Sequence, residues 1–97
     1  MIIHHRIVRK KLVFSGTVQG VGFRWHAKNA ARELGVTGWV RNEWDDTVVM
    51  EVQGTQKQIS QMILILKNAR YVHIDSIQAE ELPLVKDEKE FSVRNAW

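Results

Sequence analysis

Residues 15–24 constrain this chain more than any other stretch, because glycines at positions 16, 20 and 22 stand between an apolar run and a helical pattern. The order predicts a strand, residues 8–14, that turns sharply onto the N-terminus of a helix. Without a Cβ, glycine permits positive φ and lets several backbone N–H groups converge on one anion. The first helical turn adds unpaired donors and the positive end of the helix dipole.

The run therefore predicts a phosphate-sized anion site. Its candidate residues are Gly16, Thr17, Val18, Gln19, Gly20, Val21 and Gly22. A tight connector without a ligand is the alternative, since glycine-rich turns are common. The run lacks the Gly-Lys-Ser/Thr ending of a Walker loop and has no acidic residue at the distance that a dinucleotide ribose requires. Both nucleotide motifs are excluded.

Arg24 lies in the first turn of the predicted helix. Its planar guanidinium could clamp two oxygens of one anion. A cation is unfavourable at a helix N-terminus, and a bound anion would remove that conflict. A solvated surface arginine is the alternative interpretation.

The length and the composition, with 44% hydrophobic and 26% charged residues, fit one soluble domain over residues 1–97. The absence of cysteine excludes disulfides, thiolate nucleophiles and cysteine-based metal sites, and it fits a reducing compartment. The longest apolar run, residues 62–66, is too short to span a bilayer, and no signal peptide is evident. We expect a cytoplasmic protein without a membrane partner.

The net charge of +3 comes largely from residues 4–11. Such a basic segment could attract nucleic acid or an anionic membrane. We expect instead a ragged N-terminal extension over residues 1–7, followed by the solvated side of the first strand. His4 and His5 are adjacent at the terminus, and we expect no metal site there.

Hydrophobic periodicity predicts the remaining elements. Strands are expected at 8–14, 36–42, 47–53, 72–77 and 91–93, and helices at 23–34 and from a Thr55 cap to about residue 66. The order is the α+β, ferredoxin-like β-α-β-β-α-β plan: an antiparallel sheet with two helices on one face and a short extra C-terminal strand. The charged run 86–90 is expected to be a solvated loop.

Two motifs, GTVQGVGFR at 16–24 and GWVRN at 38–42, resemble the paired motifs of the acylphosphatases. The likeness extends from about residue 8 to residue 93. It implies hydrolysis of acyl phosphates to a carboxylate and inorganic phosphate by in-line attack of water, without a covalent intermediate, metal or cofactor. In that family the arginine matching Arg24 binds the phosphoryl oxygens and the asparagine matching Asn42 positions the water. Loop amides matching residues 17–22 surround the phosphate, although Thr17 departs from the basic residue frequent there.

The carboxamide of Asn42 offers both a donor and an acceptor, which suits a water held beside a phosphoryl group. Taken alone, without the resemblance, Asn42 is better interpreted as the residue that ends a strand and starts a turn. Phosphoryl transfer through a loose transition state depends mainly on positioning and charge stabilisation, so this sparse residue set is sufficient. Histidine can serve as a general base near neutral pH, which makes His26 a candidate, but we expect it to lie on the helix surface.

Two other classes share features with this chain. Domains that recognise RNA use the same element order and stack bases on aromatics of the central strands, but here only Phe14 supplies a ring. A regulatory domain could bind phosphate without turnover, although it would not need Asn42. We expect a monomeric enzyme for a small acyl phosphate, with no nucleic-acid partner.

A further hypothesis concerns the end of the chain: the terminal carboxylate of Trp97 pairs with Arg24 and orients it.

Overall fold

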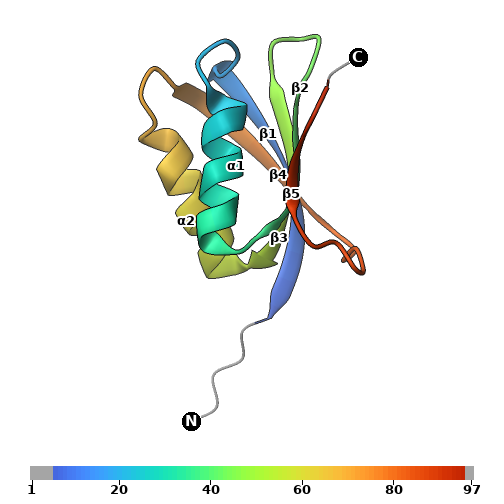
Figure 1. The fold of residues 1–97 in the computed structure, drawn as a ribbon. Helices are drawn as coiled ribbons and strands as arrows, with labels where there is room; N and C mark the ends of the chain where they lie inside the picture. The colour runs from blue at the N-terminus through green and yellow to red at the C-terminus, as the bar shows by residue number, and fades with distance from the viewer. Residues whose placement is uncertain (1–5, 96–97) are drawn as a thin grey trace.

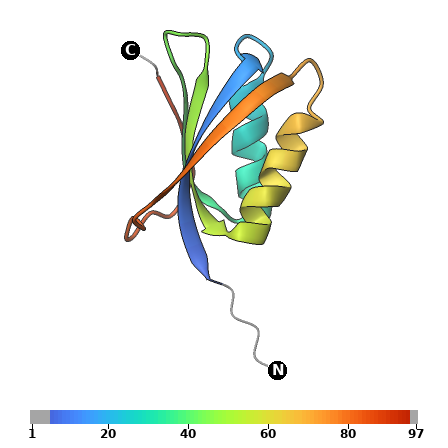
Figure 2. The ribbon, with the colours of Figure 1, turned by 180° about the vertical axis from the view of Figure 1, so that it is seen from behind.

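The computed structural model describes residues 6–95. Its elements, in chain order, are β1 (Ile7–Thr17), α1 (Phe23–Leu34), β2 (Thr37–Asn42), β3 (Val48–Thr55), α2 (Gln56–Lys67), β4 (His73–Leu82) and β5 (Phe91–Arg94). The strands form one sheet in the order β4-β1-β3-β2-β5, and both helices cover the same face (Figures 1 and 2). The predicted ferredoxin-like plan is confirmed.

The direction of the last strand differs from the expected antiparallel sheet. β1 pairs antiparallel with β3 and β4, and β2 pairs antiparallel with β3, but β5 runs parallel to β2. The sheet is therefore mixed. β4 and β5 lie at opposite edges, so residues 83–90 must carry the chain from one edge to the other, on the side of the sheet away from the helices (Figure 1). β5 then runs in the direction of β2.

Two strands are longer than their apolar patterns predict. β1 continues to Thr17, past a register shift between Ser15 and Gly16, because β4 still pairs with it there. β4 continues to Leu82 although most of its side chains are exposed. An edge strand is held by backbone pairing to one neighbour, so its sequence carries little apolar periodicity.

The caps set the ends of both helices. Gly35 adopts left-handed φ of 78° and donates its N–H to the Ala31 carbonyl, which ends α1. Thr55 and Gln58 form the predicted capping box at the start of α2. Among the described residues, no helix is long and apolar enough to cross a membrane.

The core lies between the sheet and the helices. Apolar side chains of β1, β3 and α2 fill it, with Ile63 only partly buried. The buried ones are Val8, Leu12, Phe14, Val48, Met50, Val52, Ile59, Met62 and Leu66. On α1 the small side chains of Ala27, Ala30 and Ala31 are buried and let the helix lie close to the sheet. Rings of Phe14 and Phe23 lie 4.9 Å apart, which fixes the first turn of α1 against β1.

The expectation that one side of β1 is solvated is wrong at Arg9. Only 2% of Arg9 is exposed. Its Nε donates to Glu51 at 2.9 Å, and its Nη1 donates to Gln53 at 3.1 Å and to Glu88 at 2.8 Å. Glu88 belongs to the run that was expected to be a solvated loop. The connection 83–90 crosses the sheet face opposite the helices, and the carboxylates of Glu51 and Glu88 neutralise the covered guanidinium.

Arg9→Met is expected to destabilise the fold, because it leaves two partly buried carboxylates without their partner. Removing one member of such a pair costs about 3 kcal/mol. Urea unfolding measures the change. Arg6→Met is the matched control, since the Arg6 to Glu81 ion pair is largely exposed. Equal stability of the two variants would contradict the structural role of Arg9.

The Glu88 carboxylate makes part of the stability dependent on pH. Partial burial alone would raise the pKa of Glu88, but hydrogen bonds from Arg9 and Thr37 and the charges of Arg9 and Arg94 outweigh it and lower the pKa. A carboxyl with a lowered folded-state pKa stabilises the fold above its unfolded pKa, and the effect disappears as pH falls through the folded value. The stability difference between the native chain and Glu88→Gln should therefore be full near neutral pH and shrink in acid. A difference that grows in acid would contradict this sign.

Candidate active site

The loop at residues 18–22, between β1 and α1, is anchored in the core at both ends. Val18, the first residue of the loop, is 1% exposed, and Phe23, the first residue of α1, is 2% exposed. Val21 also packs against the core from within the loop. Gly16 and Thr17, which the sequence placed in the anion loop, form the end of β1 opposite Ile74 and His73 of β4. The turn itself is therefore shorter than predicted.

Gly20 and Gly22 give the loop its shape. Their φ angles are 72° and 80°, in the left-handed region that favours glycine. Gly22 is the N-cap of α1 and supplies no side-chain cap, and the first turn contains no acidic residue. The first amide groups of α1 have no intrahelical acceptor. Backbone donors and the positive end of the helix dipole therefore face the loop without a side-chain anion.

Arg24 and Asn42 meet at one cavity beside this loop. Its volume is about 360 Å³, and its lining residues are Val18, Gly20, Gly22, Phe23, Arg24, Trp25, Lys28, Asn42 and Val93. Arg24 is the second residue of α1 and Asn42 is the last of β2, and these ends lie at the same end of the sheet (Figure 1). Two candidate residues that are far apart in the sequence therefore line the same cavity.

Both side chains are available to a ligand. Arg24 and Asn42 are half-buried, and neither makes a side-chain hydrogen bond or ion pair to another residue of the range 6–95. The hypothesis that the Trp97 carboxylate orients Arg24 lies outside the described residues, as do His4 and His5. Among residues 6–95, no carboxylate lines the cavity, and its charged lining residues are Arg24 and Lys28. The cavity is consequently suited to an anion.

Gln19 ties the loop to the turn that follows Asn42. Its Nε2 donates to the carbonyls of Glu43 and Thr47, both at 2.8 Å. Glu43 in turn donates its N–H to the Thr47 carbonyl at 2.9 Å, which closes the β2–β3 connection. One side chain therefore fixes the distance between the anion loop and Asn42. The sequence placed Gln19 in the loop but gave no indication of this side-chain role.

Three lining residues were missed from the sequence. Trp25 follows Arg24 directly, Lys28 lies one helical turn further along α1, and Val93 comes from β5. The spacing of Arg24 and Lys28 could have found the lysine, because residues four apart share a helix face. No local sequence pattern indicates that Val93 lines the cavity, because its position depends on the parallel pairing of β5 with β2. His26 does not line the cavity.

The described residues lack a set of side chains that could bind a metal ion. Within residues 6–95 there is no group of three or more His, Asp or Glu side chains placed to hold a metal ion. The polar groups that converge on the cavity are instead a guanidinium, an ammonium, a carboxamide and backbone amides.

Comparison with known proteins gives one consistent answer. The family model described as acylphosphatase matches residues 10–93. An acylphosphatase of Bifidobacterium longum is 37% identical over 91% of this chain and 93% of its own length. One of Ligilactobacillus salivarius is 41% identical over 86% of this chain and 93% of its own length.

The fold agrees with the sequence comparison. The crystal structure of acylphosphatase from Bacillus subtilis matches with a TM-score of 0.82 and 25% identity, over 90% of this chain and 98% of that one. The chain therefore belongs to the acylphosphatase family, whose members hydrolyse acyl phosphates.

Proposed function

We propose that the cavity between the 18–22 loop, Arg24 and Asn42 is where this enzyme hydrolyses its acyl phosphate. The observation that carries the proposal is that a guanidinium and a carboxamide, neither with a side-chain partner within residues 6–95, meet the backbone amides beside Gly20 and Gly22 at one cavity. Each group comes from a different element, and each suits a different part of the reaction.

Arg24 and the loop amides bind the phosphoryl group. The guanidinium offers two parallel donors to two phosphoryl oxygens. Amides of the loop and of the first turn of α1 donate to the remaining oxygens, and the helix dipole favours the negative charge. Because these donors are held before the substrate arrives, they stabilise the transition state without reorganising.

Asn42 positions the attacking water. Its carboxamide oxygen accepts a hydrogen bond from the water, which keeps an oxygen lone pair directed at phosphorus. The water oxygen forms a new bond to phosphorus while the bond from phosphorus to the carboxyl oxygen breaks. The carboxylate leaves with the electron pair, and a proton from the water passes to the phosphate or to solvent. No covalent enzyme intermediate forms.

This reaction needs little from the protein beyond position and charge. A carboxylate is a good leaving group, so the departing oxygen requires no protonation, and the loose transition state is stabilised mainly by the cations and donors around it. We therefore propose that turnover requires no metal or cofactor and continues in EDTA. A cytoplasmic location, a monomeric state and the absence of a nucleic-acid partner remain predictions from the sequence.

A phosphate-binding module without turnover is the other candidate. It would need Arg24 and the loop amides but not the carboxamide of Asn42 at the same cavity. Membership of a hydrolase family also favours the enzyme. The two candidates differ in what Asn42 does, so variants at that position separate them.

Arg24→Ala is expected to lower kcat/KM for benzoyl phosphate by about 10³-fold or more and to weaken inhibition by inorganic phosphate, because it removes the bidentate clamp. Asn42→Ala is expected to lower kcat by about 10²-fold while phosphate inhibition is largely retained, because only the water loses its partner. Loss of benzoyl phosphate absorbance in the presence of EDTA measures both.

Arg24→Lys is the matched control, since it keeps the charge without the planar clamp. We expect it to recover only part of the activity. If phosphate inhibited both alanine variants equally poorly, the division of roles between Arg24 and Asn42 would be wrong. If a folded native sample bound phosphate but did not turn over, the binding module would be the better description.

Gln19→Ala tests the tie between the loop and the hairpin. Two carbonyls lose their shared donor, which costs about 1–2 kcal/mol of stability. Because the water and the phosphoryl group are then less well aligned, kcat should fall about 10-fold or more although no group that contacts substrate has changed. Gln56→Ala, on the exposed side of α2, is the control. Unchanged kcat in a Gln19→Ala sample that is measurably destabilised would show that the tie serves folding only.

A further inference from the structure

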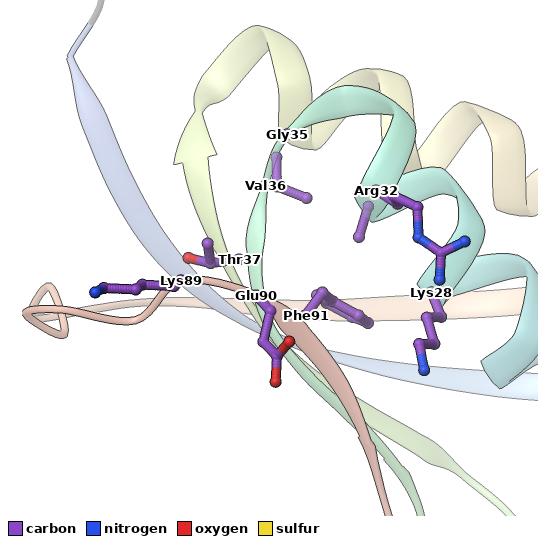
Figure 3. A pocket seen from close by; sticks show the side chains of 9 residues that line it. Lys28, Arg32, Gly35, Val36, Thr37, Lys89, Glu90 and Phe91 are labelled. Carbon is purple, nitrogen blue, oxygen red and sulfur yellow. The ribbon is translucent and has the colours of Figure 1, made fainter.

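A second cavity adjoins the proposed active site along α1. It has a volume of about 250 Å³, and its lining residues are Lys28, Ala31, Arg32, Gly35, Val36, Thr37, Lys89, Glu90 and Phe91 (Figure 3). Lys28 lines both cavities. A molecule seated on the loop therefore has space to extend past Lys28 toward the C-terminal end of α1.

Arg24, Lys28 and Arg32 form a cationic row that runs from one cavity to the other. They are four residues apart, so they share one face of α1. A rise of 1.5 Å per residue puts Lys28 about 6 Å and Arg32 about 12 Å along the helix axis from Arg24. No ion pair to any of the three occurs within residues 6–95.

The cationic row is unfavourable for the helix by itself. Like charges four residues apart repel one another, and Arg24 in the first turn also opposes the helix dipole, whereas Arg32 in the last turn complements it. The second cavity contains one carboxylate, Glu90, which forms no ion pair with its cations among the described residues. In Figure 3 Lys89 points away from Lys28 and Arg32, which leaves the latter two as the cations on the helix side of the cavity. A ligand with two anionic groups would relieve the repulsion.

We infer that the preferred substrates are acyl phosphates whose acyl group carries a second anionic group, and that Lys28 is the residue that selects them. The inference rests on the proposed function, because it assumes that the phosphoryl group is seated at Arg24. The second anion then points along α1, where Lys28 faces it and Arg32 extends the field. A distal carboxylate and a distal phosphate meet the same cations by the same chemistry.

The test uses benzoyl phosphate and 4-carboxybenzoyl phosphate, which have the same reacting group and the same rigid ring. Their ultraviolet change reports hydrolysis of both, and the para carboxylate cannot reach the anhydride to cleave it. The ratio of kcat/KM for the carboxylated substrate to that for benzoyl phosphate is the readout. We expect a ratio of about 3 to 5 in the native chain at low ionic strength, the size of effect that a partly exposed ion pair produces. Salt should lower the ratio, because it screens exposed charges.

Lys28→Gln is expected to reduce this ratio to about 1, while Lys57→Gln, which changes an exposed lysine of α2 that lines neither cavity, leaves it near the native value. A native ratio of 1 or less, or a ratio that survives Lys28→Gln, would overturn the inference while leaving the proposed function intact. An equal fall in Lys57→Gln would also overturn it, because net charge rather than Lys28 would then be responsible. If benzoyl phosphate itself were not hydrolysed by the folded native chain, the proposed function would fail instead.

Discussion

The site depends on the anchoring of one short loop in the core. Val18 and Phe23 are almost wholly buried at its two ends, and the Phe23 ring packs on Phe14 of β1. Between these anchors, Gly20 and Gly22 take left-handed φ, so the backbone turns within the loop and exposes the first amides of α1. The direction of α1, and hence the position of Arg24, follows from this packing. Gln19 extends the same constraint to the hairpin that bears Asn42.

The buried or partly buried cations on the two faces of the sheet differ in whether carboxylates lie beside them. On the face opposite the helices, Arg9 is covered and its charge is balanced by Glu51 and Glu88. On the helix side, Arg24 and Lys28 line a cavity to which no carboxylate of the described range 6–95 contributes. A balanced cation stabilises the fold, whereas an unbalanced cation at a cavity costs some stability and creates affinity for an anion. The first arrangement holds the connection that leads to β5 against the sheet, and the second is where we propose that the substrate binds.

Most of the fold could be predicted because its elements carry strong local signals: the alanine-rich face of α1, the Thr55 capping box and the alternation in β3. What could not be predicted depends on tertiary pairing. β5 runs parallel to β2 because its connection crosses the sheet, and β4 is long because β1 supports it. In the site, the meeting of Arg24 with Asn42 was anticipated from the paired motifs. The hydrogen bonds of Gln19 and the place of Val93 were not, because they join segments whose separation in space no local pattern encodes.

The central claim is that water attacks phosphorus directly, opposite the leaving carboxylate. Stereochemistry at phosphorus tests it most directly. A benzoyl thiophosphate made chiral with ¹⁸O would be hydrolysed by the native chain in H₂¹⁷O, and the configuration of the thiophosphate product determined. One in-line attack by water inverts the configuration, and inversion is the result we predict. Retention would require two displacements and a covalent intermediate, and it would contradict the role assigned to Asn42.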